Sequence, residues 1–172
     1  MEKFIPDIYQ KNIYDIDYQK LKKKGIKCLL FDLDNTLVPV KDDVPNKKVK
    51  ELFNYLERDF KVIIISNSNK KRLIPFKEGL NVDVAASARK PSKKKYLKIM
   101  SIYKFKEYQI AAIGDQLLTD IFGANRIGIT SILINPIGEY EKFGTKINRF
   151  IEGFIKRKLK RKGILIKGEY YD

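Results

Sequence analysis

The chain has 172 residues, of which 44% are hydrophobic and 33% charged, with a net charge of +15, one Cys and no His. These values predict a folded chain of one domain, or one domain with an appendage, and they exclude a mostly disordered protein. Because His is absent and Cys28 stands alone, Ser-His-Asp catalysis, a zinc site of Cys or His and an intramolecular disulfide are all excluded.

Alternating apolar runs and amphipathic segments predict an α/β fold. Residues 1–24 are expected to form an N-terminal extension packed on the core, with a short helix beginning after Asp17. Short apolar runs predict buried strands at 26–31, 61–65, 82–86, 109–113 and 130–135. Helical spacing predicts helices between them at 44–60, 69–78, 92–103 and 117–125. This order predicts a five-stranded parallel, Rossmann-like sheet flanked by helices over residues 25–138.

The remaining segment, 139–172, is predicted to be a basic amphipathic helix and tail. Its apolar stripe consists of Ile147, Phe150, Ile151, Phe154, Ile155 and Leu159. The opposite face carries Lys146, Arg149, Lys156, Arg157, Lys160 and Arg161. We expect the stripe either to pack on the domain or to contact an anionic membrane through residues 146–162. The high net charge favours an anionic partner, and the alternative is a lysine-rich composition without a binding role.

Polar residues follow four of the predicted strands, and these are the candidates for a functional site. Asp32, Asp34 and Thr36 follow the first strand, and Ser66 and Asn67 follow the second. Lys90 comes just after the third strand, and Asp115 and Asp120 follow the fourth. Because ligands of open α/β sheets bind beyond the carboxyl ends of the strands, these side chains are expected to meet in one crevice.

This set of side chains predicts phosphoryl chemistry. Clustered carboxylates repel one another unless a cation neutralises them, and ligand sets made only of oxygen suit Mg²⁺. An Asp carboxylate can attack phosphorus, and a second carboxyl can protonate the leaving oxygen and then activate water. Lys90 and the Ser66 hydroxyl would supply the positive charge and the hydrogen-bond donor that a transferred phosphoryl group needs.

The motifs resemble those of the haloacid dehalogenase (HAD) superfamily of phosphatases over residues 26–135. The matching segments are Phe31-Asp32-Leu33-Asp34-Asn35-Thr36-Leu37, Ile65-Ser66-Asn67, Lys90-Pro91 and Gly114-Asp115-Gln116-Leu117-Leu118-Thr119-Asp120. The resemblance implies that Asp32 is the nucleophile and Asp34 the general acid and base. It also implies that Ser66, Asn67 and Lys90 hold the phosphoryl oxygens. Mg²⁺ would be held by Asp32, the backbone carbonyl of Asp34 and Asp115, with Thr36 and Asp120 in supporting roles.

The short connections predict that the site has no cap domain. Only eight residues, Leu37 to Val44, separate the first motif from the next helix, and 86–90 is equally short. An open site suits a phosphate on something large, such as a lipid, a protein or a nucleic acid end.

The chain is similar to the YqeG-like group of subfamily IIIA, which is related to mitochondrial phosphatidylglycerophosphate phosphatases. The features that carry this similarity are Pro6 to Tyr14, Gly25-Ile26-Lys27, Val38-Pro39 and Ala88-Arg89-Lys90-Pro91. The resemblance implies hydrolysis of phosphatidylglycerophosphate to phosphatidylglycerol.

The sequence leaves two other functions open. The enzyme could act on a soluble or nucleic-acid phosphate, or the basic surface could bind RNA or ribosomes beside an incidental phosphatase site. No apolar stretch reaches the ~20 residues that a membrane-spanning helix needs, and no signal peptide is recognisable. We therefore expect a cytoplasmic protein that is peripheral to the inner membrane leaflet.

Overall fold

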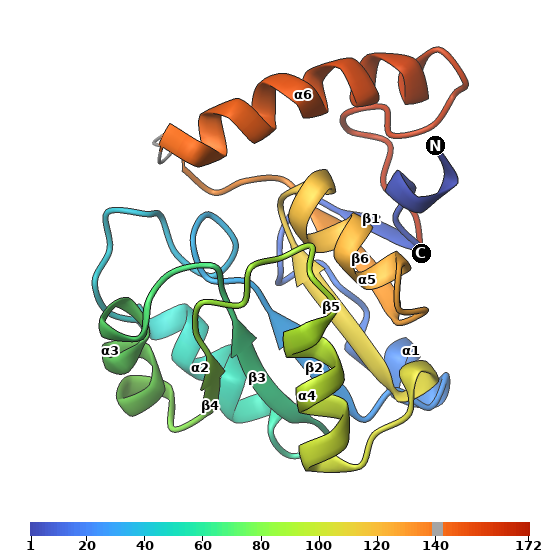
Figure 1. Ribbon diagram of the computed structural model, residues 1–172. Helices are drawn as coiled ribbons and strands as arrows, with labels where there is room; N and C mark the ends of the chain where they lie inside the picture. Colours follow the sequence, from blue (N-terminus) through green and yellow to red (C-terminus); the bar gives the residue numbers. More distant parts are fainter. Residues whose placement is uncertain (139–142) are drawn as a thin grey trace.

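A six-stranded sheet in which every pairing is parallel runs through the protein in the order β1-β6-β5-β2-β3-β4 (Figure 1). The computed structural model describes residues 1–138 and 143–172. The strands are β1 (Ile8–Gln10), β2 (Cys28–Phe31), β3 (Lys61–Ile65), β4 (Asp83–Ala85), β5 (Ile110–Gly114) and β6 (Thr130–Ile134). The predicted α/β class and parallel sheet are confirmed, and β2 to β6 are the five strands expected from the apolar runs.

The predicted number of strands was wrong by one, because β1 comes from the N-terminal extension. It pairs with β6 in parallel, with Ile8 opposite Ile132, and Tyr9 forms an antiparallel bridge with Tyr171 near the other end of the chain. The strand is only three residues long and lies in a stretch that mixes aromatic, polar and charged residues. Its conformation therefore depends on partners more than 120 residues away, which no local pattern reports.

Helices cover both faces of the sheet. The bounds are η1 (Glu2–Phe4), α1 (Tyr18–Lys23), α2 (Lys47–Leu56), α3 (Lys70–Leu80), α4 (Lys94–Tyr103), η2 (Glu107–Gln109), the π-helical turn η3 (Leu117–Ile121), α5 (Phe122–Asn125) and α6 (Phe143–Lys160). Side chains of α1, α2 and α3 belong to the core on one face, and those of α4 and α5 to the core on the other. Asn46 and Asn69 cap α2 and α3 by accepting backbone N–H groups of Val49 and Arg72, both at 3.0 Å.

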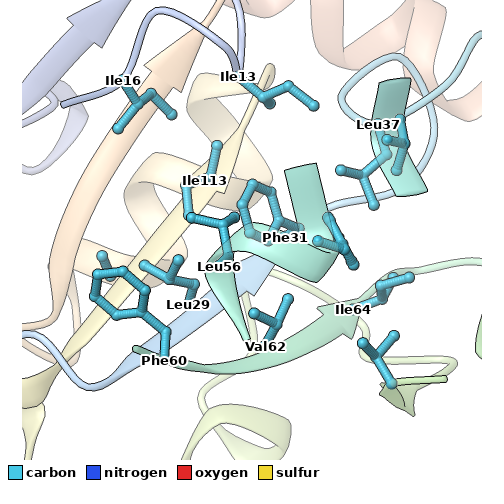
Figure 2. Close-up of a cluster of buried hydrophobic side chains, with 14 of the residues drawn as sticks. Ile13, Ile16, Leu29, Phe31, Leu37, Leu56, Phe60, Val62, Ile64 and Ile113 are labelled. Carbon is cyan, nitrogen blue, oxygen red and sulfur yellow. The ribbon is translucent and has the colours of Figure 1, made fainter. Parts of the chain in front are cut away.

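The two cores are built by alternate residues of the central strand β2. Leu29 and Phe31 point to one face (Figure 2). On this face the Phe31 and Phe53 ring centroids lie 5.2 Å apart. Cys28 and Leu30 point to the other face. Cys28 is completely buried, and burial raises the pKa of its thiol to about 12. This burial agrees with its interpretation as a core residue.

Helix α6 lies across the end of the sheet at which the polar strand ends gather (Figure 1). Glu152 and Leu159 are buried on its inner side, and Ile155 packs against a cluster that includes Tyr9 and Leu117. The predicted apolar stripe is therefore divided, because its other members are solvent-exposed: Ile147, Phe150, Ile151 and Phe154. The first residues of the predicted C-terminal segment, 139–142, lie outside the described part of the chain. Among the described residues, no helix is long and apolar enough to cross a membrane.

Candidate active site

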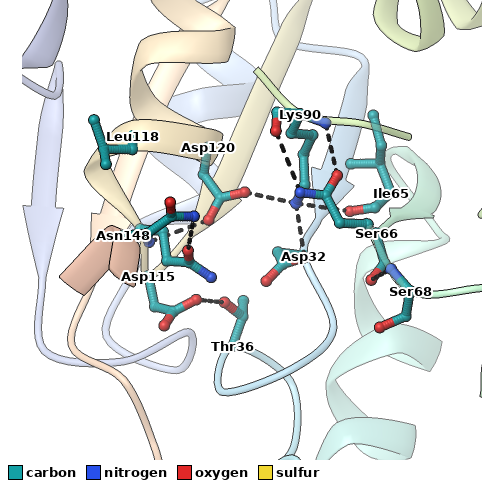
Figure 3. A network of polar contacts seen from close by, with 12 residues as sticks. Asp32, Thr36, Ile65, Ser66, Ser68, Lys90, Asp115, Leu118, Asp120 and Asn148 are labelled. Carbon is teal, nitrogen blue, oxygen red and sulfur yellow. Dashed lines mark hydrogen bonds and ion pairs between the residues drawn. The ribbon is translucent and has the colours of Figure 1, made fainter. Parts of the chain in front are cut away.

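The predicted strand-end residues gather around one cavity of 680 Å³ at the carboxyl ends of β2 and β3. Its lining includes Asp32, Asp34, Ser66, Asn67 and Lys90. Helix α6 contributes Asn148 to the same lining. Asp115, Asp120 and Thr36 are buried beside these residues and belong to the same polar network (Figure 3). The structure thus brings together the side chains that the sequence predicted would meet.

Because the chain turns tightly after β2, the carboxyl groups of Asp32 and Asp34 contact different residues. Asn35 takes a left-handed conformation with φ of 64°, which an Asn tolerates better than most residues. The Asp34 carboxylate accepts hydrogen bonds from Arg72 Nη2 at 2.9 Å and from Ser68 Oγ at 2.7 Å. Arg72 also donates to the backbone carbonyl of Val40 at 3.1 Å, which ties the loop after β2 to α3. Sequence reasoning missed Arg72, whose only signal is its place in the first turn of the helix after the Ser66 loop.

Lys90 lies at the centre of the buried network. Its ammonium donates to Asp32 Oδ1 at 2.7 Å, to Asp120 Oδ1 at 2.6 Å and to the carbonyl of Ile65 at 3.0 Å (Figure 3). Burial lowers the pKa of Lys90, but the carboxylates of Asp120 and Asp32 outweigh this effect and raise it overall. Lys90 is therefore held in its charged form between two carboxylates.

Three buried carboxylates, those of Asp32, Asp115 and Asp120, each offer an oxygen within 4.8 Å of the others. Burial raises the pKa of Asp32 and of Asp115, and the neighbouring carboxylates add to this effect. Asp120 was predicted as a supporting residue, and it stands in the cluster itself. Its position depends on Gly114, where a Cβ atom would lie 2.3 Å from Asp120 Cγ. An oxygen-only set of this kind fits a hard divalent cation.

The other predicted residues brace this cluster. Thr36 donates to Asp115 Oδ1 at 3.0 Å, and the buried Ser66 hydroxyl accepts the N–H of Ser68 at 3.1 Å. Asn67 accepts the backbone N–H of Lys90 at 2.6 Å and donates to the Lys90 carbonyl at 3.3 Å. Its amide therefore holds the backbone of Lys90 at the edge of the cavity.

Helix α6 adds a second arginine that sequence reasoning did not assign to the site. Arg149 forms an ion pair with the Asp115 carboxylate through Nη2, and its Nη1 donates to the Asp115 carbonyl at 2.7 Å. Glu152 is buried between Arg149 Nη1, at 3.1 Å, and the N–H of Leu118, at 2.9 Å. In the sequence, Arg149 is one of many basic residues on the helix, so no pattern distinguishes it.

Comparison with known proteins identifies the family. The family model of the mitochondrial PGP phosphatases matches residues 1–137, which is most of the chain. The chain belongs to the PGP phosphatase family. The Bacillus subtilis protein named "Probable phosphatase YqeG" is 39% identical over 161 residues, and the alignment covers 93% of this chain and 94% of that protein.

A further sequence relative and a solved structure are also similar to this chain. "Phosphatidylglycerophosphate phosphatase 1, chloroplastic" of Chlamydomonas reinhardtii is 28% identical, and the alignment covers 87% of this chain and 60% of that protein. The crystal structure of a 2-haloacid dehalogenase from Pseudomonas syringae superposes with a TM-score of 0.54 at 16% identity, covering 68% of this chain and 90% of that one. This structural likeness shows the HAD fold. The resemblance to HAD phosphatases and to the YqeG-like group, which the motifs indicated, is confirmed. The protein is a HAD-type phosphatase of the PGP phosphatase family.

Proposed function

We propose that this phosphatase is a Mg²⁺-dependent enzyme that hydrolyses phosphatidylglycerophosphate through an aspartyl-phosphate on Asp32. The observation that carries the proposal is the position of the Asp32 carboxylate. It lines an open cavity while its oxygen contacts Lys90 and lies beside Asp115 and Asp120. The proposed nucleophile, the ammonium group of Lys90 and a carboxylate cluster therefore lie side by side.

The cation would be held by Asp32, Asp115 and the backbone carbonyl of Asp34, with Asp120 close enough to join or support them. When bound, Mg²⁺ would neutralise the clustered carboxylates and the charge on the phosphoryl oxygens. The buried oxygen donors support Mg²⁺ because this ion prefers carboxylate oxygens and water to nitrogen or sulfur ligands.

The residues of the chain account for both half-reactions. In the first, an oxygen of Asp32 attacks phosphorus, the bond from phosphorus to the leaving oxygen breaks, and Asp34 donates a proton to that oxygen. In the second, water attacks the same phosphorus, Asp34 accepts a proton from it, and the acyl-phosphate P–O bond breaks to release phosphate and free Asp32. Lys90 and Ser66 hold the phosphoryl oxygens during both steps.

The substrate class is supported by the cavity and by the family. Within residues 1–138 and 143–172, no cap domain covers the cavity, since the loop after β2 and the segment before Lys90 are short, and α6 lies at its rim. A phosphate on a lipid head group could therefore enter without leaving the bilayer. The phosphatidylglycerophosphate phosphatases among the relatives support this substrate over a soluble ester.

Helix α6 would provide the membrane contact. Its exposed face carries Phe150, which is 69% exposed, and Phe154, which is 53% exposed, beside Ile147 and Ile151. Exposed basic residues flank this face: Lys146, Arg157, Lys158, Lys160, Arg161 and Lys162. Apolar side chains surrounded by basic ones suit the surface of an anionic bilayer, where each nearby Lys or Arg contributes about 1 kcal/mol. Because Asn148 of the same helix lines the cavity, membrane contact would bring the cavity to the lipid phosphates.

The first test replaces the proposed nucleophile. Asp32→Asn should lower turnover of phosphatidylglycerophosphate at least about 10³-fold, because the neutral amide cannot form the acyl-phosphate. Asp15→Asn, which removes one charge from an exposed loop, is the matched control and should retain full activity. Phosphate release by the Asp32→Asn variant at a tenth of the normal rate or more would remove Asp32 as the nucleophile.

The second test identifies the substrate. Phosphatidylglycerophosphate in anionic vesicles, phosphatidic acid, nucleotides, sugar phosphates and 5′-phosphorylated RNA should be compared by kcat/KM. We expect the first to be hydrolysed best. A soluble ester or an RNA end that exceeds it would contradict the lipid substrate while leaving the phosphatase chemistry intact.

A further inference from the structure

Arg149 is the point at which α6 contacts the carboxylate cluster. Its side chain is 19% exposed, and it bonds both the carboxylate and the carbonyl of Asp115, which is completely buried. The same guanidinium pairs with Glu152, whose side chain is 1% exposed. A partly buried Arg between two buried carboxylates is strongly held only while both partners keep their charge and position.

The Asp115 carboxylate has two occupied oxygens. Oδ1 accepts the Thr36 hydroxyl at 3.0 Å, and Oδ2 forms the ion pair with Arg149. Asp115 also belongs to the three-carboxylate cluster to which the proposed function assigns a divalent cation. A divalent cation and a guanidinium that share one buried carboxylate repel each other, so each must weaken the hold of the other.

The N-terminal half of α6 contacts the domain through polar side chains, which include Asn148, a donor to Gln116 Oε1 at 3.5 Å. In the described part of the helix, Arg149 and Glu152 contact the cluster and the N–H of Leu118, whereas Phe150 and Phe154 face outward. Leu159 and Ile155 anchor the second half. A weaker pair between Arg149 and Asp115 would therefore loosen the half of α6 that lines the cavity with Asn148.

We propose that Arg149 is a positioning residue that couples the docking of α6 to cation binding at Asp115. The proposal rests on the proposed function, because it needs a cation at the carboxylate cluster. Docking of α6 lowers the affinity of the cluster for the cation, and cation binding loosens α6 at the rim of the cavity. The two effects must be equal in size because coupling between binding equilibria is reciprocal.

The decisive measurement is the Mg²⁺ affinity by titration calorimetry, without substrate. Arg149→Gln should bind Mg²⁺ about tenfold more tightly than the unaltered protein, within the usual range of such couplings. Lys158→Gln removes the same charge from an exposed position of the same helix and should leave the affinity unchanged. Equal or weaker binding by Arg149→Gln would overturn the coupling. Absence of saturable Mg²⁺ binding in all three proteins would overturn the proposed cation site as well.

A second measurement needs no variant, so it holds even if Arg149→Gln disturbs the fold. Amide hydrogen exchange over 146–160 should be followed in the unaltered protein with and without saturating Mg²⁺. We expect Mg²⁺ to speed exchange in the first half of α6 by about the same factor as the change in Mg²⁺ affinity caused by Arg149→Gln. Exchange becomes faster because a single helix that is not docked is only marginally stable. Unchanged or slower exchange of these amides with Mg²⁺ would overturn the proposal.

Discussion

Asp32 and Asp34 stand two positions apart, yet their side chains serve different environments. The Asp32 carboxylate is buried against Lys90, whereas Asp34 is held at the cavity wall by Arg72 and Ser68. A nucleophile must be held beside the positive charge that stabilises the phosphoryl group. A group that transfers protons must instead face the leaving oxygen in the first step and the attacking water in the second. The separation of the two carboxyl groups therefore agrees with two different roles, and Arg72 maintains it.

Replacement of Arg72 should expose this role. Arg72→Ala should lower kcat/KM about 10- to 100-fold for an alkyl phosphate, because a positioned general acid contributes at least 10²-fold and kcat/KM does not include the later hydrolysis of the acyl-phosphate, which is common to all substrates. The loss should be much smaller for p-nitrophenyl phosphate, whose leaving group needs no proton. Lys71→Ala, on the exposed side of α3, is the control. Equal losses with both substrates would mean that Arg72 acts only on the fold.

The predicted site residues that lie together in the structure share one property. Asp32, Ser66, Lys90 and Asp115 occur in motifs at the ends of consecutive strands, so their order along the chain reports their convergence in space. Arg72 and Arg149 lie in no such motif and reach the site from helices. Among 36 Lys and Arg residues, only the packing of α3 and α6 distinguishes them.

Dependence on distant packing also limits the prediction of whole strands and helices. Strands β2, β3, β5 and β6 were predicted because each is an apolar run that its own residues define. Strand β1 and the orientation of α6 depend on distant partners, namely β6, Tyr171 and the Asp115 network. The N-terminal half of α6 also turns two charged residues, Arg149 and Glu152, toward the domain, whereas amphipathic spacing alone predicts apolar residues on a packed face.

The exposed face of α6 can be tested without disturbing the core. Phe150→Ser combined with Phe154→Ser should weaken binding to anionic vesicles at least about tenfold, since each buried Phe contributes roughly 1.5–3 kcal/mol. The free energy of unfolding should change by less than about 1 kcal/mol, because both side chains are exposed. Vesicle sedimentation and urea unfolding measure the two quantities.

The control for that experiment lies at the opposite end of the sheet. Tyr108 is 66% exposed just before β5, far along the chain from α6, and Tyr108→Ser removes a similar exposed ring. This variant should bind vesicles like the unaltered protein. If it loses as much binding as the α6 variant, general surface hydrophobicity rather than α6 is responsible.

The stability of the whole molecule should depend on both pH and the cation. Burial raises the pKa of Asp32 and Asp115 above that of an unfolded Asp, which is ~4, so folding favours their protonated forms. Their contribution to stability is therefore complete below that pH and is lost as the pH rises toward neutrality. In EDTA, the Tm should fall between about pH 5 and pH 8.

Mg²⁺ should reverse this fall because it binds the ionised carboxylates. At a hundred times its Kd the ion adds about 2.7 kcal/mol, and it should add more at pH 8 than at pH 5. Asp115→Asn should reduce both effects. A thermal shift by Mg²⁺ of equal size at the two pH values would contradict a site made of these carboxylates.

The burial of Cys28 has a practical consequence for following α6. The only thiol of the chain is enclosed in the core and resists ionisation, so it should remain inert to maleimide reagents while the protein is folded. A Phe150→Cys variant would then carry one reactive sulfur, at the centre of the outward face of the helix. An environment-sensitive dye attached there could report, in real time, when this helix enters a lipid surface and when the ion alters its mobility.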